Sequence, residues 1–165
     1  MKRIIFILCL LLITGCTSNN KAFGNIQLEN DYFNEKYEMN ETNLKMYKLD
    51  FPASLNHEQI IDDKKYILLL LGKTCEASKS FLNELVKVYN NQDYKFDKIY
   101  IFEVEDYLSD VESETEENRE KFKNKFDISS VPVSFFFANG KKYATEVGYY
   151  PDSVIKDVLD EFDER

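Results

Sequence analysis

One cysteine stands where its side chain can do chemistry. Cys75 follows a continuous apolar run and precedes a segment with helical spacing, and Ser78 comes three residues later. A thiolate attacks a disulfide sulfur, and the free amide groups and positive dipole end of a helix N-terminus stabilise a thiolate. If Thr74 caps this helix, Cys75 lies in its first turn. Two interpretations of Cys75 remain open, a reactive thiol and an inert, small apolar side chain at a helix start.

The charged and polar neighbours of Cys75 act in opposite directions. Lys73 and Lys79 would support a thiolate, whereas Glu76 opposes it. Ser78 returns to the same helix face one turn later, so its hydroxyl is expected to donate a hydrogen bond to the sulfur. A serine cannot resolve a mixed disulfide. The predicted chemistry therefore runs through one thiol, and a small thiol or a partner's cysteine must complete the cycle.

The amino terminus has the features of a secretory signal. Two basic residues precede an apolar stretch, Ile4–Ile13, which as a helix would rise only about 15 Å, half the thickness of a bilayer core. The stretch ends in Ile13-Thr14-Gly15-Cys16, which resembles a bacterial lipobox; an ordinary signal peptide with an incidental cysteine is the alternative. We expect residues 1–15 to be a lipoprotein signal peptide and Cys16 to be the lipid attachment site.

Cysteine counting isolates a single free thiol. Cys9 leaves with the signal peptide and Cys16 would carry lipid, so Cys75 is the only free thiol of the expected mature chain. No internal disulfide is then available, although an exported protein meets an oxidising compartment. Residues 17–43 are rich in Asn and Glu and have no steady hydrophobic period. We interpret residues 16–43 as the lipidated cysteine and a flexible tether, with room for a short docked segment.

The overall composition excludes several classes of function. The 165 residues carry 21 basic and 30 acidic side chains, a formal charge of −9, which argues against binding to nucleic acid or to anionic lipid headgroups. The single histidine, His57, excludes most zinc sites and histidine-based catalysis, and we interpret it as a solvated helix residue. The nine acidic residues within Glu103–Glu120 lack the spacing of a calcium loop. We expect a solvated helix face there, and no metal ion or cofactor.

Hydrophobic patterning predicts an α/β domain. The apolar run Tyr66–Leu71 has strand length and no alternation, which is typical of a strand buried on both faces. Further strands are predicted over Met46–Leu49, Lys98–Val104, Val133–Phe137 and Tyr143–Val147, with a hairpin at Asn139-Gly140. Helices are predicted from Ser54 or Asn56 through Ile61, around Phe81–Tyr89, over Glu112–Phe126, and from Pro151 or Asp152 through Phe162. This order indicates a central mixed β-sheet flanked by helices on both faces.

The element order, with Cys75 on the step from a buried strand to a helix, resembles the thioredoxin superfamily. Thr74–Ser78 occupies the place of the family's Cys-x-x-Cys motif, Val131-Pro132-Val133 that of its proline loop, and Phe135–Lys141 that of the strand and hairpin that follow. The resemblance covers Leu44 to Glu161, so we expect residues 44–165 to form a thioredoxin-like domain. It implies a cis peptide before Pro132 and a groove in which Pro132 faces Cys75.

The chain departs from the family pattern at three positions. Ser78 replaces the second cysteine, Thr74 replaces an aromatic residue, and Leu69 stands where the family has a buried carboxylate that accepts a proton. Each departure lowers the expected rate of dithiol–disulfide turnover. The resemblance therefore implies a thioredoxin-like site with Cys75, Ser78 and Pro132 as its candidate catalytic residues.

Two functions from different classes follow. The first is a membrane-anchored, extracytoplasmic monothiol protein that exchanges disulfides with exported proteins or peptides; the resemblance extends to bacteriocin transport accessory proteins of Gram-positive bacteria. The second is a non-catalytic binding or chaperone-like module that holds an extended chain in the groove at Pro132. A weaker third is an immunity-like or surface adhesion role without thiol chemistry. We expect a monomer attached to the membrane by lipid.

Overall fold

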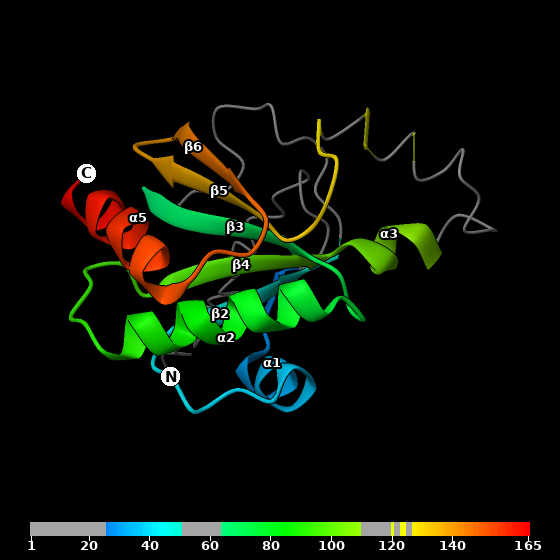
Figure 1. Cartoon of the computed structure of the whole chain (residues 1–165), viewed down its shortest axis with the longest axis horizontal. Coiled ribbons are helices and arrows are strands. Elements are labelled where there is room, and N and C mark those ends of the chain that lie inside the picture. Colours follow the sequence, from blue (N-terminus) through cyan, green and yellow to red (C-terminus); the bar gives the residue numbers. More distant parts are fainter. Residues whose placement is uncertain (1–25, 51–63, 110–119, 121–122, 125–126) are drawn as a thin grey trace, which may run out of the picture.

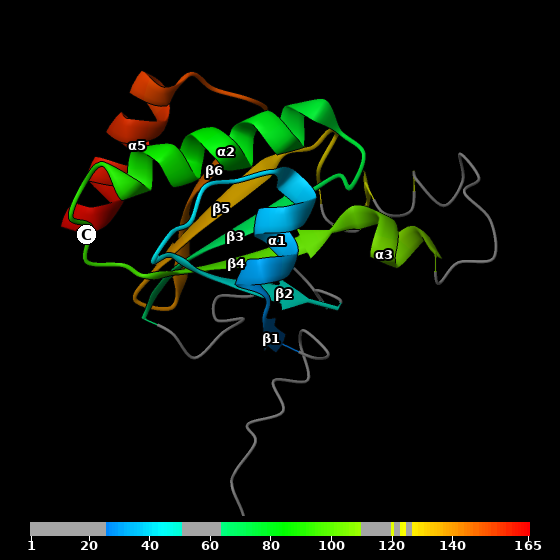
Figure 2. The same cartoon turned by 90° about the horizontal axis from the view of Figure 1, so that it is seen from below.

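A single mixed β-sheet organises the chain. The computed structural model describes residues 26–50, 64–109, 120, 123–124 and 127–165. Its six strands lie in the order β1-β2-β4-β3-β5-β6 (Figures 1 and 2). The strands are β1 (Ile26–Leu28), β2 (Lys45–Leu49), β3 (Lys65–Leu71), β4 (Lys98–Glu103), β5 (Val133–Ala138) and β6 (Lys141–Val147). The described helices are α1 (Asn30–Tyr37), α2 (Glu76–Asn90), α3 (Val104–Ser109) and α5 (Asp152–Glu164).

Strand β3 lies in the middle of the sheet, as its uninterrupted apolar sequence predicts. It pairs parallel with β4 and antiparallel with β5, and every residue from Tyr66 to Leu71 is buried. Its alternate side chains contribute to two core layers, with Leu69 and Leu71 on one side and Leu68 and Leu70 on the other. The expected mixed α/β sheet is confirmed.

The predicted hairpin joins β5 to β6. Asn139 and Gly140 have φ angles of 52° and 76°, the left-handed conformations that a two-residue hairpin turn needs and that these two residue types tolerate. The strands pair antiparallel with an irregularity between Phe136 and Phe137. The hairpin makes β6 an edge strand of the described sheet.

Helices α2 and α5 cover one core layer, where they lie side by side in Figures 1 and 2. Their buried apolar residues recur at helical spacing, as the sequence predicts; they are Phe81, Leu82, Leu85, Val86 and Val88 on α2 and Ile155, Leu159 and Phe162 on α5. Val154, which precedes the buried Ile155 on α5, is exposed, with 38% of its surface accessible. Burial of the apolar stripe against the sheet holds both helices in place.

The amino-terminal part of the described chain belongs to the fold. Strand β1 pairs antiparallel with β2, and α1 buries Phe33 and Tyr37, which lie one helical turn apart and enter the same core layer as α2. The interpretation of residues 16–43 as a tether is therefore wrong for residues 26–37, although it allowed for a docked segment. An apolar stripe of two aromatic residues on an eight-residue helix is too short to produce a clear period in the sequence.

Several predicted features lie outside the described residues. These are the signal peptide with Cys16, the helix expected from Ser54 or Asn56 with His57, and almost all of the helix expected over Glu112–Phe126. Among the helices that the structure describes, none has the length and apolar character needed to cross a membrane.

Candidate functional site

The loop between β3 and α2 presents Cys75 at the beginning of a helix. The Cys75 amide donates a hydrogen bond to the carbonyl of Gly72 (3.2 Å), and the Cys75 carbonyl accepts the first helical bond from Lys79 (3.0 Å). Cys75 is thus the N-cap residue of α2, with extended backbone angles and no capping bond from its side chain. The sequence offered Thr74 as a cap, which would have placed Cys75 in the first turn. The helix instead begins one residue later, because Cys75 has φ −88° and ψ 112°.

The proline loop faces this cysteine, as the family resemblance implied. The peptide bond between Val131 and Pro132 is cis, and the thiol of Cys75 lies 4.0 Å from the carbonyl oxygen of Val131. The carbonyl of Pro132 accepts a hydrogen bond from Gly148 (2.8 Å), which anchors the loop to the end of β6. Two segments 56 positions apart thereby meet at a half-buried thiol.

Ser78 lies beside the loop but does not contact the sulfur. Its side chain is fully buried, and its hydroxyl oxygen accepts a hydrogen bond of 3.0 Å from the amide of Gly72. The expected bond from Ser78 to Cys75 is therefore wrong, because the hydroxyl points back to the end of β3. Ser78 instead ties the first turn of α2 to the loop that precedes Cys75.

Gly72 allows Cys75, Val131 and Glu105 to approach one another. A Cβ atom at Gly72 would lie 2.8 Å from Cys75 Cβ, 3.3 Å from Val131 Cγ2 and 3.5 Å from Glu105 Oε1. The first distance is shorter than a normal carbon–carbon contact, so no larger residue fits without displacing the cysteine. The loop thus requires glycine at this position.

Both lysines that were expected to support a thiolate have carboxylate partners. The side chain of Lys73 pairs with Asp106, and the backbone N–H of Lys73 donates to Glu105 Oε1 (2.8 Å). Lys79 pairs with Glu38 (2.9 Å), which follows α1. These contacts direct the lysine charges toward carboxylates on α3 and next to α1, which reduces their availability to the sulfur.

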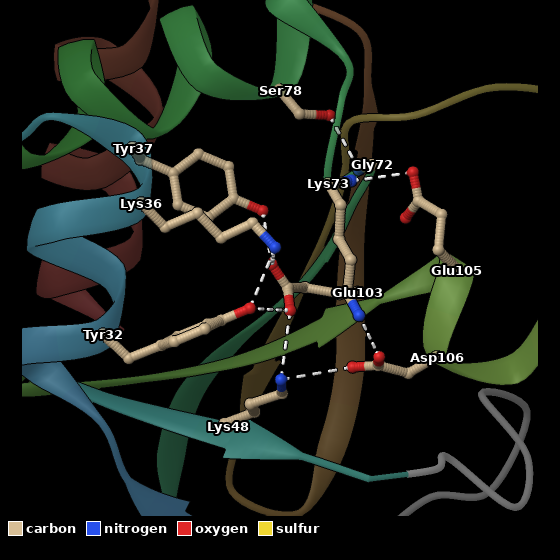
Figure 3. A network of polar contacts seen from close by, with 10 residues as sticks. All are labelled: Tyr32, Lys36, Tyr37, Lys48, Gly72, Lys73, Ser78, Glu103, Glu105 and Asp106. Atoms are coloured by element: carbon tan, nitrogen blue, oxygen red, sulfur yellow. Dashed lines mark hydrogen bonds and ion pairs between the residues drawn. The ribbon is translucent and has the colours of Figure 1, made fainter. Parts of the chain in front are cut away.

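A buried carboxylate lies at the end of β4, close to this loop (Figure 3). Glu103 is 0% exposed. It accepts hydrogen bonds from the hydroxyl groups of Tyr32 (2.6 Å) and Tyr37 (2.9 Å). It also pairs with Lys36 (2.9 Å) and Lys48 (3.2 Å). We call Glu103 and these four partners the Glu103 cluster.

The carboxyl group of Glu103 is favoured in its ionised form although it is buried. Burial opposes ionisation of Glu103, but hydrogen bonds from Tyr32, Lys36 and Tyr37 outweigh it and hold the pKa of this carboxyl below its usual value. Burial also lowers the pKa of Lys48, yet the charges of Glu103 and Asp106 leave it raised overall. Because Lys48 contacts Asp106 (3.3 Å), which also holds Lys73, the cluster is connected to the Cys75 loop.

Sequence reasoning missed the Glu103 cluster. Glu103 was counted only as the first member of an acidic run, and Tyr32, Lys36 and Tyr37 were assigned to a tether. The available signal was a carboxylate directly after the apolar strand Ile99–Phe102, a place where a buried charge needs partners. Its partners come from α1 and β2 and could not be identified from local spacing.

The described residues contain no group of three or more His, Cys, Asp or Glu side chains arranged to hold a metal ion.

Leu69, at the position where the family carries a buried carboxylate, is fully buried in the apolar layer. The arrangement around Cys75 thus offers one thiol, one proline loop and a set of paired charges.

The comparison with protein families agrees with this architecture. A family described as a thioredoxin-like domain matches residues 57–163. The chain therefore belongs to the thioredoxin-like family, and its mixed sheet has the expected thioredoxin-like fold. No curated protein sequence matches the chain.

Solved structures of thioredoxins are similar to the chain at low sequence identity. The thioredoxin Mala s 13 from Malassezia sympodialis is 18% identical over 61% of this chain and 76% of its own, with a TM-score of 0.44. A thioredoxin-like protein from Clostridium perfringens is 20% identical over 66% of this chain and 74% of its own, with a TM-score of 0.42.

Proposed function

We propose that this chain is a thioredoxin-like protein in which Cys75 exchanges disulfides as a single thiol. The observation that carries the proposal is the position of the Cys75 sulfur, at the start of α2 and 4.0 Å from the carbonyl oxygen of Val131, before cis-Pro132. The Cys75 thiol is half-buried there. It borders the loop at Pro132, whose backbone would bind an extended chain of a client.

The proposed reaction stops at a mixed disulfide. The Cys75 thiol releases its proton to solvent, its sulfur bonds to one sulfur of a client disulfide, and the other client sulfur leaves as a thiolate. Ser78 carries a hydroxyl where a second thiol would attack, so an external thiol must release the client. Such a protein is a poor reductase and a stable partner for one client at a time.

The proposed location is the outer face of a bacterial membrane. The basic start, the apolar stretch and Cys16 support a lipid anchor, and the clients would then be exported proteins or peptides. The finer proposal, from the sequence resemblance, is an accessory role in bacteriocin transport. Cys16 and Cys75 would act separately, one as the anchor and the other as the reactive thiol.

A non-catalytic binding module is the second candidate. The pairing of Lys73 with Asp106 and of Lys79 with Glu38 favours it, because both cations next to the thiol are partly neutralised. In that case the backbone of the loop at Pro132 would hold an extended chain, and Cys75 would be dispensable.

Trapping in cells distinguishes the two candidates. Cells that express the full chain are quenched in acid and alkylated, and the protein is examined on non-reducing gels. We expect reducible adducts that disappear in Cys75→Ser. As a matched control, Ser80→Cys in the Cys75→Ser background places a thiol at an exposed position of α2, and it should not restore the same adducts. If Cys75 forms no adduct and resists alkylation in the folded chain, the binding module replaces the proposed exchange function.

A further inference from the structure

We propose that the Cys75 site selects disulfides that carry positive charge and disfavours anionic ones. This inference rests on the proposed exchange function and adds a substrate class to it. It follows from the charges around the thiol, counted with their partners.

The lysines in contact with the loop and the Glu103 cluster are all engaged by carboxylates. Lys79 lies 2.9 Å from Glu38, and Lys36 lies 2.9 Å from Glu103. Lys48 bridges Glu103 (3.2 Å) and Asp106 (3.3 Å), while Lys73 is also held by Asp106. Each lysine charge is therefore compensated at short range before a ligand arrives.

Two carboxylates beside the thiol have no such compensation. Glu76 directly follows Cys75 on the exposed first turn of α2, and Glu105 lies in the first turn of α3, next to the loop. Within the part of the chain that the structure describes, neither has a lysine or arginine within ion-pair distance; Glu105 Oε1 accepts only the backbone N–H of Lys73. Its second oxygen, Oε2, is buried without a hydrogen-bond partner among these residues.

Glu105 is close enough to act on Cys75. Its Oε1 atom and the Cys75 Cβ atom lie 3.5 Å and 2.8 Å from one point, the position that a Cβ on Gly72 would occupy. Figure 3 shows the Glu105 carboxylate directed at this loop from α3. A charge on a client disulfide bound at Cys75 therefore comes within the range of both Glu76 and Glu105.

The net charge of the side chains around Cys75 is negative even when the lysines are included. Counting all nine side chains, the five carboxylates (Glu38, Glu76, Glu103, Glu105 and Asp106) exceed the four lysines by one. The N-terminus of α2 contributes about half a positive charge, which reduces the excess but does not cancel it. The formal charge of the whole chain, −9, has the same sign.

The expected effect is moderate and depends on salt. Coulomb interactions of two partly shielded charges with a singly charged group at this range change a rate by about tenfold at low ionic strength. At 1 M salt the Debye length is about 3 Å, so the preference should largely disappear. The charges also attract a cationic client before the sulfur atoms meet.

The test uses small disulfides of different charge with the full chain carrying Cys9→Ser and Cys16→Ser, so that Cys75 is its only thiol. The probes are cystamine (cationic), hydroxyethyl disulfide (neutral) and dithiodiglycolate (anionic), and mass spectrometry follows adduct formation. In each reaction Cys75 sulfur bonds to one probe sulfur and the other leaves as a thiolate. Each rate is divided by the rate for the same chain unfolded in urea, which removes differences in intrinsic reactivity between the probes.

We expect the normalised rate for cystamine to exceed that for dithiodiglycolate by about tenfold at low salt, with hydroxyethyl disulfide between them. Glu76→Gln and Glu105→Gln should each reduce this ratio by about two- to threefold. Glu164→Gln, which removes the same charge from an exposed position at the end of α5, should leave the ratio unchanged. If Glu105 had only a structural role, Glu105→Gln would change the rates with all three probes by the same factor.

Two negative outcomes have different meanings. If hydroxyethyl disulfide forms the Cys75 adduct but the three normalised rates are equal, or the anionic probe is the fastest, the charge preference is overturned and the exchange function stands. If none of the probes reacts with the folded chain while all react with the unfolded chain, the exchange function itself fails and the charge preference falls with it.

Discussion

The hydroxyl group of Tyr37 donates a hydrogen bond of 2.9 Å to the carboxylate of Glu103, 66 positions later in the chain. This bond joins the last residue of α1 to the last residue of β4. It makes the amino-terminal helix part of the structure that supports the Cys75 loop, because Lys48 and Asp106 extend the same network to Lys73.

The first prediction concerns this buried carboxylate. Glu103→Gln should lower the free energy of unfolding by about 2–3 kcal/mol, since Lys36 and Lys48 would lose their common partner in a largely buried place. Urea unfolding followed by circular dichroism measures the change. Glu84→Gln, which loses only an exposed pair with Lys87, should change the unfolding free energy by less than about 0.5 kcal/mol. Equal effects of the two substitutions would contradict the assigned importance of the Glu103 cluster.

The contribution of Glu103 should also depend on pH. Its pKa in the folded chain lies below the usual value of 4.5, so the stabilisation is complete above the pKa of the unfolded chain and is lost as the pH falls through the folded value. The difference in unfolding free energy between the wild type and Glu103→Gln should therefore be constant near pH 7 and shrink below about pH 4.5. A difference that grows on acidification has the wrong sign for this assignment.

The second prediction tests whether α1 belongs to the domain. Phe33 is 0% exposed, and Phe33→Ala should cost about 3–4 kcal/mol of unfolding free energy, because it leaves a cavity in the core layer shared with α2. Asp31→Ala, on the exposed side of the same helix, controls for helix propensity and should cost less than about 0.5 kcal/mol. If Phe33→Ala is as mild as Asp31→Ala, the helix is only loosely attached.

The third prediction concerns the close approach at Gly72. Gly72→Ala would place a Cβ atom 2.8 Å from Cys75 Cβ, so the loop must shift, at a cost of about 1–3 kcal/mol. The rate of Cys75 alkylation in the folded chain should change with it, because the thiol moves relative to Val131. Ser80→Ala, an exposed change on α2, should affect neither stability nor alkylation. An unchanged alkylation rate in stable Gly72→Ala would show that the loop does not set the thiol position.

The fourth prediction separates one-thiol from two-thiol chemistry. The unaltered chain should reduce insulin at a rate near background. Ser78→Cys should raise this rate, because the new thiol can resolve the mixed disulfide. Ser78→Ala removes the acceptor for the buried amide of Gly72 and controls for that loss, at a cost of about 1–3 kcal/mol in stability without a gain in activity. Rapid insulin reduction by the unaltered chain would contradict the proposed mechanism.

The fifth prediction concerns membrane attachment. A palmitate label should enter the full chain in cells and be lost in Cys16→Ala, and release of the protein from membranes should require detergent, since two or more acyl chains anchor stably. Cys9→Ala, within the apolar stretch, should retain the label. Labelling that persists in Cys16→Ala would identify another attachment point and refute the assignment of Cys16.

Local patterns in the sequence were enough to predict the framework of the domain. The unbroken apolar run of β3, the Asn139-Gly140 turn and the helical spacing on α2 and α5 each act over a few neighbouring residues, so they can be identified without knowing the fold. The position of Cys75 between a buried strand and a helix, and of Pro132 before the next strand, could also be assigned, because each element boundary has a local signal.

The side chains that surround the thiol come together only in the folded chain. The capping role of Cys75 depends on its backbone angles, the partner of Ser78 is an amide of the preceding loop, and the ionic partners of Lys73 come from another helix. Within the Glu103 cluster, Glu103 accepts hydrogen bonds from two tyrosines that lie 71 and 66 positions earlier in the chain. Hydrophobic periodicity reports which face of an element is buried, but not which element will face it; packing of the sheet and helices brings such distant charges together, and burial makes their pairing obligatory.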